Sequence, residues 1–167
     1  MTDPCIYEVI AEAKKFRLKL DLSKKANIRF ITQDFPVMSC KLSSLLFTYH
    51  ALKKWPSIVI YGVSGIASNH DGDDVISHYW LECQEIAIDL TADQYNIIEE
   101  KNLNKEIILS RPFNPVSTGS IGSMQNYNLF KISYRDTYIC GLPELAEDFL
   151  DDLYASYEAL EGVALFT

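Results

Sequence analysis

Two segments near the start of the chain have the apolar spacing of amphipathic helices. We expect Asp3 to cap the first helix, which carries Pro4 in its first turn and ends near Leu20. We expect Ser39 to cap the second helix, which Pro56 closes. The apolar stripes consist of Ile6, Val9, Ile10, Ala13 and Phe16 in the first helix and of Leu42, Leu45, Leu46, Tyr49 and Leu52 in the second.

The middle of the chain has the patterns of strands instead. Residues 58–63 form an apolar run that predicts a buried strand, and residues 75–90 predict a β-hairpin that turns at Gln84 and Glu85. Helices followed by mainly antiparallel strands, with further helices between them, indicate an α+β fold. Three shorter runs predict additional strands, at residues 28–31, 106–109 and 128–134.

The remaining segments are expected to be loops and short helices. Residues 64–74 and 111–127 are rich in glycine, serine and other turn-forming residues and predict loops, the second of them long. Thr91 and Gln94 have the spacing of a capping box that opens a short helix. A last helix is expected to open at Pro143, with an apolar face and an opposite acidic face.

Composition restricts the possible partners. The 167 residues are 48% apolar and 23% charged, which is typical of one soluble globular domain over residues 1–167. A net charge of −8 disfavours nucleic acid and an anionic membrane surface as partners and leaves a basic protein or peptide open. The N-terminus lacks the basic and apolar regions of a secretory signal, so we expect a cytoplasmic protein, with signal-free export as an alternative.

The cysteines and acidic residues have neither the spacing of a metal site nor that of a disulfide framework. No C-x-x-C pair occurs, so we expect reduced thiols. The acidic run at 70–74 lacks the register of a calcium loop, and no second histidine stands at a zinc spacing. We therefore expect neither a metal nor a cofactor, and we interpret this run as the rim of a substrate cleft. Three thiols are interpreted as structural: Cys5, Cys83 and Cys140.

Cys40 stands apart because of its position at the first turn of the second predicted helix. The helix dipole and free backbone amides favour a thiolate there. A turn at Gln84 and Glu85 makes His78 and Asp89 diagonal neighbours on one face of the hairpin, roughly 7 Å apart at Cβ. A cysteine nucleophile needs such a base with an orienting partner. The alternative interpretation is that Cys40 is a small buried residue at a helix start.

The arrangement resembles the papain-like/transglutaminase-like cysteine enzyme superfamily. The resemblance covers residues 39–91 and is carried by Cys40 at a helix start, by His78-x-Trp80-x-Glu82, and by the run Ile-Asp-Leu-Thr that contains Asp89. Its most specific part, His-x-Trp-x-Glu followed by Ile-Asp-Leu-Thr, resembles runs in small bacterial transglutaminase-like domains, including the leader-peptide proteases of lasso-peptide pathways. The resemblance implies an antiparallel sheet with the nucleophile helix packed against it.

The same resemblance implies roles for individual residues. Cys40 corresponds to the nucleophile, His78 to the general base and acid, and Asp89 to the group that orients the imidazole. Papain-like enzymes place a glutamine shortly before the cysteine as an oxyanion donor, which makes Gln33 a candidate, together with the backbone amide of Cys40. Trp80 is expected to form a wall of the site. Glu82 is expected to be solvated or to pair with a cation.

The predicted function is therefore acyl transfer from an amide of a protein or peptide. Peptide hydrolysis, glutamine deamidation and transglutamination share this chemistry, and the residues do not choose among them. Small papain-fold deamidases also occur as bacterial toxins and effectors. Two alternatives remain: a non-catalytic interaction module on this fold, such as an immunity or adaptor protein, and a cell-wall amidase.

Overall fold

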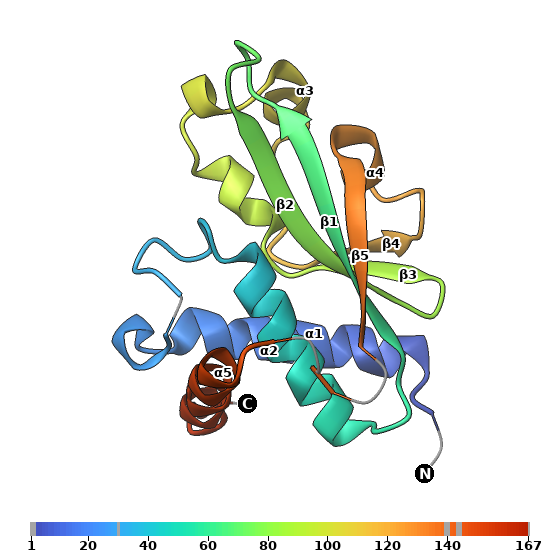
Figure 1. Cartoon of the computed structure of the whole chain (residues 1–167), viewed down its shortest axis with the longest axis vertical. Coiled ribbons are helices and arrows are strands. Elements are labelled where there is room, and N and C mark those ends of the chain that lie inside the picture. Colours follow the sequence, from blue (N-terminus) through green and yellow to red (C-terminus); the bar gives the residue numbers. More distant parts are fainter. Residues whose placement is uncertain (1–2, 30, 139–140, 143–144, 167) are drawn as a thin grey trace.

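The computed structural model describes residues 3–29, 31–138, 141–142 and 145–166. Within these residues, the centre is a five-stranded antiparallel sheet in the order β4-β3-β2-β1-β5 (Figure 1). The strands are β1 (Ile60–Ser68), β2 (Val75–Cys83), β3 (Ile86–Asp89), β4 (Ser117–Ser120) and β5 (Lys131–Tyr138). The helices are α1 (Ile6–Leu22), η1 (Lys25–Asn27), α2 (Cys40–Lys54), η2 (Ala92–Asn96), η3 (Glu100–Asn102), α3 (Lys105–Leu109), α4 (Asn126–Leu129) and α5 (Glu147–Glu161). The predicted α+β class is confirmed.

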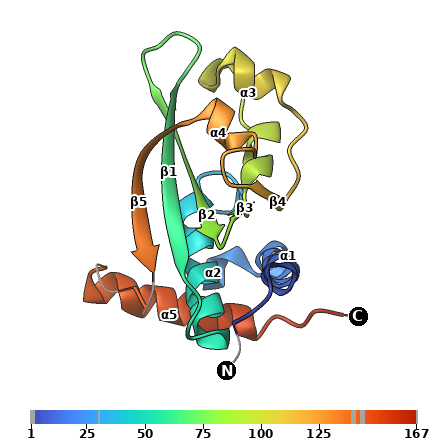
Figure 2. The same ribbon diagram turned by 90° about the vertical axis from the view of Figure 1, so that its right-hand side faces the viewer.

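Apolar side chains cover both faces of the sheet. One core joins α1, α2 and α5 to the face that carries Tyr79 and Leu81. A second core packs the segment 92–113 and α4 against the face that carries Val63 and Trp80. Figure 2 shows α3 and α4 beside the upper part of the sheet and α1, α2 and α5 around its lower part. Because alternate residues of β2 serve different cores, His78 and Trp80 share the second face.

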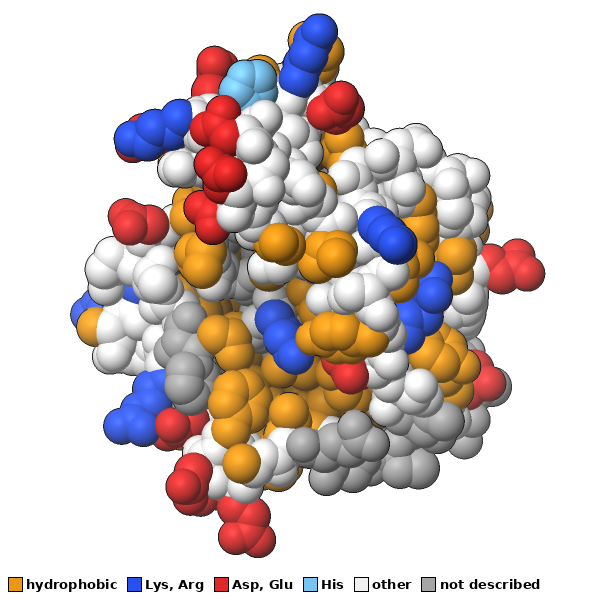
Figure 3. Space-filling view, turned by 45° about the horizontal axis from the view of Figure 1, so that its top comes forward, with side chains coloured by type: hydrophobic (Ala, Val, Ile, Leu, Met, Phe, Trp, Pro, Cys, Tyr) orange, Lys and Arg blue, Asp and Glu red, His pale blue; other side chains and the backbone are white. Residues whose placement is uncertain are grey.

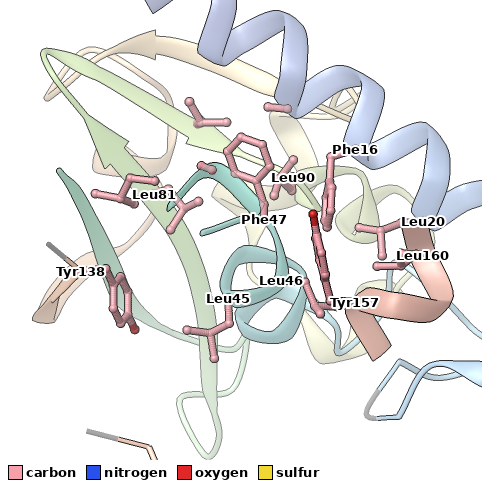
Figure 4. Packing of buried hydrophobic residues seen from close by; sticks show 14 of the residues in the cluster. Phe16, Leu20, Leu45, Leu46, Phe47, Leu81, Leu90, Tyr138, Tyr157 and Leu160 are labelled. Carbon is pink, nitrogen blue, oxygen red and sulfur yellow. The ribbon is translucent and has the colours of Figure 1, made fainter. Parts of the chain in front are cut away.

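The first core fixes the position of α2 (Figure 4). Phe47 of α2 packs edge-on against Phe16 of α1, with ring centroids 5.6 Å apart. Leu45 and Leu46 are also fully buried in this cluster. Burial of each such side chain contributes about 1.5–3 kcal/mol. The same contacts therefore hold the first residue of α2, Cys40, in place.

The predicted hairpin with a two-residue turn is confirmed. Cys83 pairs with Ile86 across the turn, and Gln84 has the positive φ (55°) that tight hairpin turns favour. β2 has nine residues and β3 only four, so the ladder between them covers only the end of β2 nearest the turn. The first half of that edge of β2 is left for other segments, and His78 lies there.

A glycine on β1 makes room for the residues around His78. Gly65 is the register partner of His78. A Cβ atom at this position would lie 2.7 Å from a ring carbon of Trp80 and 2.7 Å from Cβ of Phe130. Trp80 and Phe130 can thus pack directly over the backbone of β1 because position 65 has no side chain.

Several local predictions are wrong. The cap of α1 is Cys5 rather than Asp3, and its backbone amide donates to Glu8 (2.9 Å). The described part of 28–31 forms no strand, because Ile28 buries its side chain without a ladder partner. Residues 106–109 belong to helix α3, whose cap is the side chain of Asn104.

Other boundaries differ because tertiary contacts extend or interrupt the expected elements. β1 continues to Ser68, so only residues 69–74 of the predicted loop 64–74 remain a loop. The predicted loop 111–127 contains β4, which completes the sheet beside β3. α4 occupies the start of the predicted strand 128–134, and β5 begins only at Lys131. The last helix begins at Glu147, and Pro143 lies outside the described residues.

Candidate active site

His78 and Asp89 form a buried pair at the end of the hairpin. Nε2 of His78 donates to Oδ2 of Asp89 over 2.6 Å. The side chains are 1% and 0% exposed, respectively. The hairpin register brings the two residues together because they lie on the same face of adjacent strands.

Two further donors hold the carboxylate of Asp89. Nδ2 of Asn126 donates to Oδ2 (2.7 Å), and the backbone amide of Thr91 donates to Oδ1 (3.0 Å). Burial alone would raise the pKa of Asp89, but the charge and hydrogen bond of His78 and these two donors hold the pKa below its ordinary value. Asp89 therefore stays ionised although it is fully buried.

Aromatic rings enclose the imidazole of His78. Tyr95 meets it edge-on, with centroids 5.1 Å apart, and Phe130 and Trp80 lie at 5.3 Å and 6.1 Å. Nε1 of Trp80 donates to the hydroxyl of Tyr127 (3.3 Å), which fixes the indole. Trp80 is fully buried and thus forms one wall of the site. The three rings together hold the imidazole in one orientation.

The environment favours the charged form of His78. Burial alone would lower the pKa of this imidazole. The carboxylate of Asp89, followed by a hydrogen bond and charge interaction with Cys40, raises the pKa to about 10. The imidazolium is therefore the expected form at neutral pH.

Cys40 is the first residue of α2, directly after the cap residue Ser39. Its thiol is half-buried and lies near enough to His78 and Tyr95 to act on the pKa of both side chains. His78 thus interacts with both Asp89 and Cys40. The positive end of a 15-residue helix also faces the thiol.

Gln94 is a member of this site that the sequence patterns did not reveal. Its Nε2 atom lies 3.1 Å from Nδ1 of His78, and its Oε1 atom accepts the backbone amide of Met38 (3.3 Å). The expected capping box is absent, and the hydroxyl of Thr91 has no hydrogen-bond partner among the described residues. The capping-box interpretation assigned Gln94 a purely local role. Its position in the first turn after Asp89 was the signal that could have identified it as a residue of the site.

The structure places Gln33 elsewhere. It lies exposed in the turn before Met38 and lines a hollow with Lys24 and Phe35. Among the described residues, the glutamine that contacts His78 is Gln94.

Glu82 belongs to a separate polar cluster farther along β2. It is buried and accepts two hydrogen bonds from Arg135, each 3.1 Å long, and one from the hydroxyl of Tyr127 (2.6 Å). Of the two expectations for Glu82, the cation partner is confirmed and the solvated side chain is wrong. Tyr127 links this cluster to Trp80, so Glu82 supports the wall of the site.

A buried arginine anchors the segment that follows Asp89. Arg17 of α1 is 4% exposed and forms a two-pronged ion pair with Asp93 (2.7 and 2.8 Å). It also donates to the carbonyl oxygens of Leu90 and Pro115, each over 2.8 Å. Because residues 90–93 lie between Asp89 and Gln94, this clamp fixes the positions of both.

An open cleft of about 410 Å³ is lined by Gln94 and Tyr95, the two residues that contact His78, although Cys40, His78 and Asp89 do not line it themselves. Its walls come from Met38, from the hairpin residues 74–77 and from parts of segment 94–103. Of the run 70–74 that we interpret as a rim, Asp74 lines this cleft and residues 70–73 do not; Asn69, just before the run, lines it as well. No group of three or more His, Cys, Asp or Glu side chains among the described residues is placed to hold a metal ion.

The other thiols have different surroundings. Cys83 is buried, and burial raises its pKa to about 11. Cys5 is exposed at the start of α1. Cys140 lies outside the described residues.

Comparisons of this chain with family models, curated proteins and solved structures find no match. None of the helices in the described ranges is long and apolar enough to cross a membrane. The assignment of function therefore depends on the geometry of the site.

Proposed function

We propose that the protein is a cysteine-dependent acyl-transfer enzyme that acts on an amide of a protein or peptide. Cys40 is the nucleophile, His78 the general base and acid, and Asp89 the residue that orients the imidazole. The observation that carries this proposal is a buried His78 that bonds Asp89 through one nitrogen and lies beside the half-buried thiol of a helix N-terminus. A structural His–Asp pair alone would need neither that thiol nor the adjoining cleft.

The reaction begins with a thiolate–imidazolium pair. The sulfur of Cys40 attacks the amide carbonyl carbon, a C–S bond forms, and negative charge moves to the carbonyl oxygen. The imidazolium of His78 then gives its proton to the departing nitrogen as the C–N bond breaks, leaving a thioester. His78 next accepts a proton from water, whose oxygen attacks the thioester and releases the acid and the Cys40 thiolate. Replacing water by an amine gives transglutamination.

Gln94 and the backbone amide of Cys40 are proposed as the donors to the oxyanion. Nδ1 of His78 can accept from Gln94 only while it carries no proton. In the imidazolium form, the Nε2 amide of Gln94 loses that acceptor but stays anchored through Met38. It is then free to donate to an oxygen that forms next to the sulfur of Cys40.

Cysteine alkylation tests the proposal with a control inside the same chain. Cys5 and Cys40 both lie at helix N-termini, so the rate difference between them reports the contribution of His78. With iodoacetamide near pH 6.5, and mass spectrometry to separate the peptides, we expect Cys40 to react at least about tenfold faster. His78→Ala should reduce its rate to that of Cys5.

Product analysis identifies the reaction. Wild-type protein and Cys40→Ser are incubated with a mixture of proteome-derived peptides, and ammonia and new N-termini are measured. Ammonia without new N-termini indicates deamidation, and new N-termini indicate peptide hydrolysis. If Cys40 reacts no faster than Cys5, and His78→Ala leaves its rate unchanged, the enzyme proposal fails and a non-catalytic interaction module is favoured.

A further inference from the structure

Two residues that contact His78 also line the cleft. Gln94 contacts both His78 and the backbone of Met38, and Tyr95 packs edge-on against His78. Both residues also line the cleft of about 410 Å³. A group that fills this cleft therefore contacts two of the residues that hold the imidazole of His78.

The cleft has an apolar floor, and its edge carries both apolar and polar side chains. Leu103 and Tyr95 are 1% and 2% exposed and form its deepest part. Val75 and Met38 are 68% and 78% exposed at its edge. The volume is at the small end of the range for ligand pockets, about 300–1,000 Å³. Such a site suits one large apolar side chain of an extended peptide better than the surface of a folded partner.

The charge at the edge of the cleft has one sign. Among the described residues that line the cleft, the charged side chain is Asp74, and Asp71 and Asp73 lie beside it in the same loop. Figure 3 shows acidic side chains near the top of the molecule, with Lys or Arg and His side chains among them, and apolar side chains below. A cation on the substrate would be attracted to this edge, and a carboxylate would be repelled.

We infer that the cleft selects peptide substrates that carry a large apolar side chain next to the reacting amide, with a lysine or arginine close by. This inference rests on the proposed function, because it requires that Cys40 attacks the substrate. The apolar side chain of the substrate is transferred from water into the cleft. The basic side chain of the substrate pairs with the carboxylate of Asp74 at the edge.

Peptidyl electrophiles test this specificity. Acyloxymethyl ketones that differ only in the side chain next to the carbonyl (leucine, phenylalanine, serine or aspartate) are compared by their rate of labelling Cys40. Each rate is divided by that of iodoacetamide, which does not need the cleft. We expect leucine and phenylalanine to exceed serine by about 10–200-fold, with aspartate slowest. A second series places lysine or glutamate beside leucine, and lysine should react faster.

Neighbouring residues provide matched variants. Ile98 lines the cleft, whereas Ile97 is 61% exposed and does not. Ile98→Ser should remove most of the preference for leucine, and Ile97→Ser should leave it intact. Val75→Ser is the second cleft variant, since its exposed side chain can be shortened without unfolding the core. Asp74→Asn should remove the preference for lysine.

The outcomes separate this inference from the proposed function. If iodoacetamide labels Cys40 rapidly in a His78-dependent way but the four ketones react equally, the specificity inference fails and the enzyme proposal stands. The same conclusion holds if the cleft variants keep the full leucine preference. If Cys40 shows no enhanced reactivity toward iodoacetamide, the enzyme proposal fails, and the inference about its substrate fails with it.

Discussion

Replacement of Asp89 by asparagine tests whether its charge controls His78. The substitution keeps the shape of the side chain but removes the negative charge 2.6 Å from Nε2. The pKa of His78 is about 10, against an ordinary value of 6.5, although burial acts in the opposite direction. Loss of a close opposite charge lowers a pKa by about 1–3 units, at about 1.36 kcal/mol per unit. The protonated His78 stabilises the folded state. We therefore expect Asp89→Asn to remove about 1.4–4 kcal/mol of this stabilisation.

The sign of the pH dependence follows from the direction of the shift. Between pH 6.5 and about 10, the folded protein keeps a proton on His78 that the unfolded chain has already released. The stabilisation is therefore complete below pH 6.5 and is lost as the pH rises towards 10. Cys40→Ser is the background for the measurement, because Cys40 itself helps to raise the pKa of His78. Without the thiol, the upper limit of the pH range lies somewhat below 10.

Urea unfolding at several pH values between about 6 and 10 measures the effect. The unfolding free energy of Cys40→Ser should fall by about 1.4–4 kcal/mol more over this range than that of the double variant Cys40→Ser/Asp89→Asn. The charge of Asp89 also helps to raise the pKa of Tyr95, so the comparison stops at pH 10, and the other tyrosine and lysine titrations cancel in the difference. Parallel curves would show that the charge of Asp89 does not control the protonation of His78, and the reasoning would be refuted.

Three further predictions concern the supports of the site. Arg17→Met should lower the unfolding free energy by about 3 kcal/mol because it removes a buried guanidinium and leaves the half-buried carboxylate of Asp93 and two backbone carbonyls without their donor, whereas Arg29→Met removes an exposed ion pair and should cost about 0–1 kcal/mol. Gly65→Ala should cost at least about 1–3 kcal/mol by overpacking, and Gly119→Ala, where the nearest atom is 3.3 Å away, should cost less. Thermal and urea unfolding check both pairs; equal effects within a pair would contradict the burial argument. Gln94→Ala should reduce turnover about 10²–10³-fold while iodoacetamide still labels the nucleophile rapidly, and unchanged turnover would exclude an oxyanion role.

Local sequence patterns sufficed for part of the candidate site. The turn at Gln84 and Glu85 sets the register of β2 and β3, and strand periodicity then places His78 and Asp89 on one face. The helix signal at Ser39 likewise places Cys40 at a helix start. These inferences need only neighbours along the chain or across a tight turn.

The same patterns failed where an element has no strong local signal or depends on a distant partner. Residues 28–31 have a strand-like composition, yet Ile28 is buried in the core without a partner strand. The segment 106–109 is apolar enough for a strand, but the cap formed by Asn104 closes a helical turn there. β4 forms from a segment with loop-like composition because β3 offers it an edge to pair with.

By itself, the sequence determined the α+β class, the hairpin and the helix that carry the three candidate catalytic residues. The tertiary structure alone decided which other residues complete the site. Gln94 and Asn126 meet His78 and Asp89 across 16 and 37 positions of chain, and Arg17 reaches Asp93 across 76. Contacts at such separations depend on how the two cores pack against the sheet. Periodicity and turn chemistry act over only a few residues, so they cannot specify those contacts.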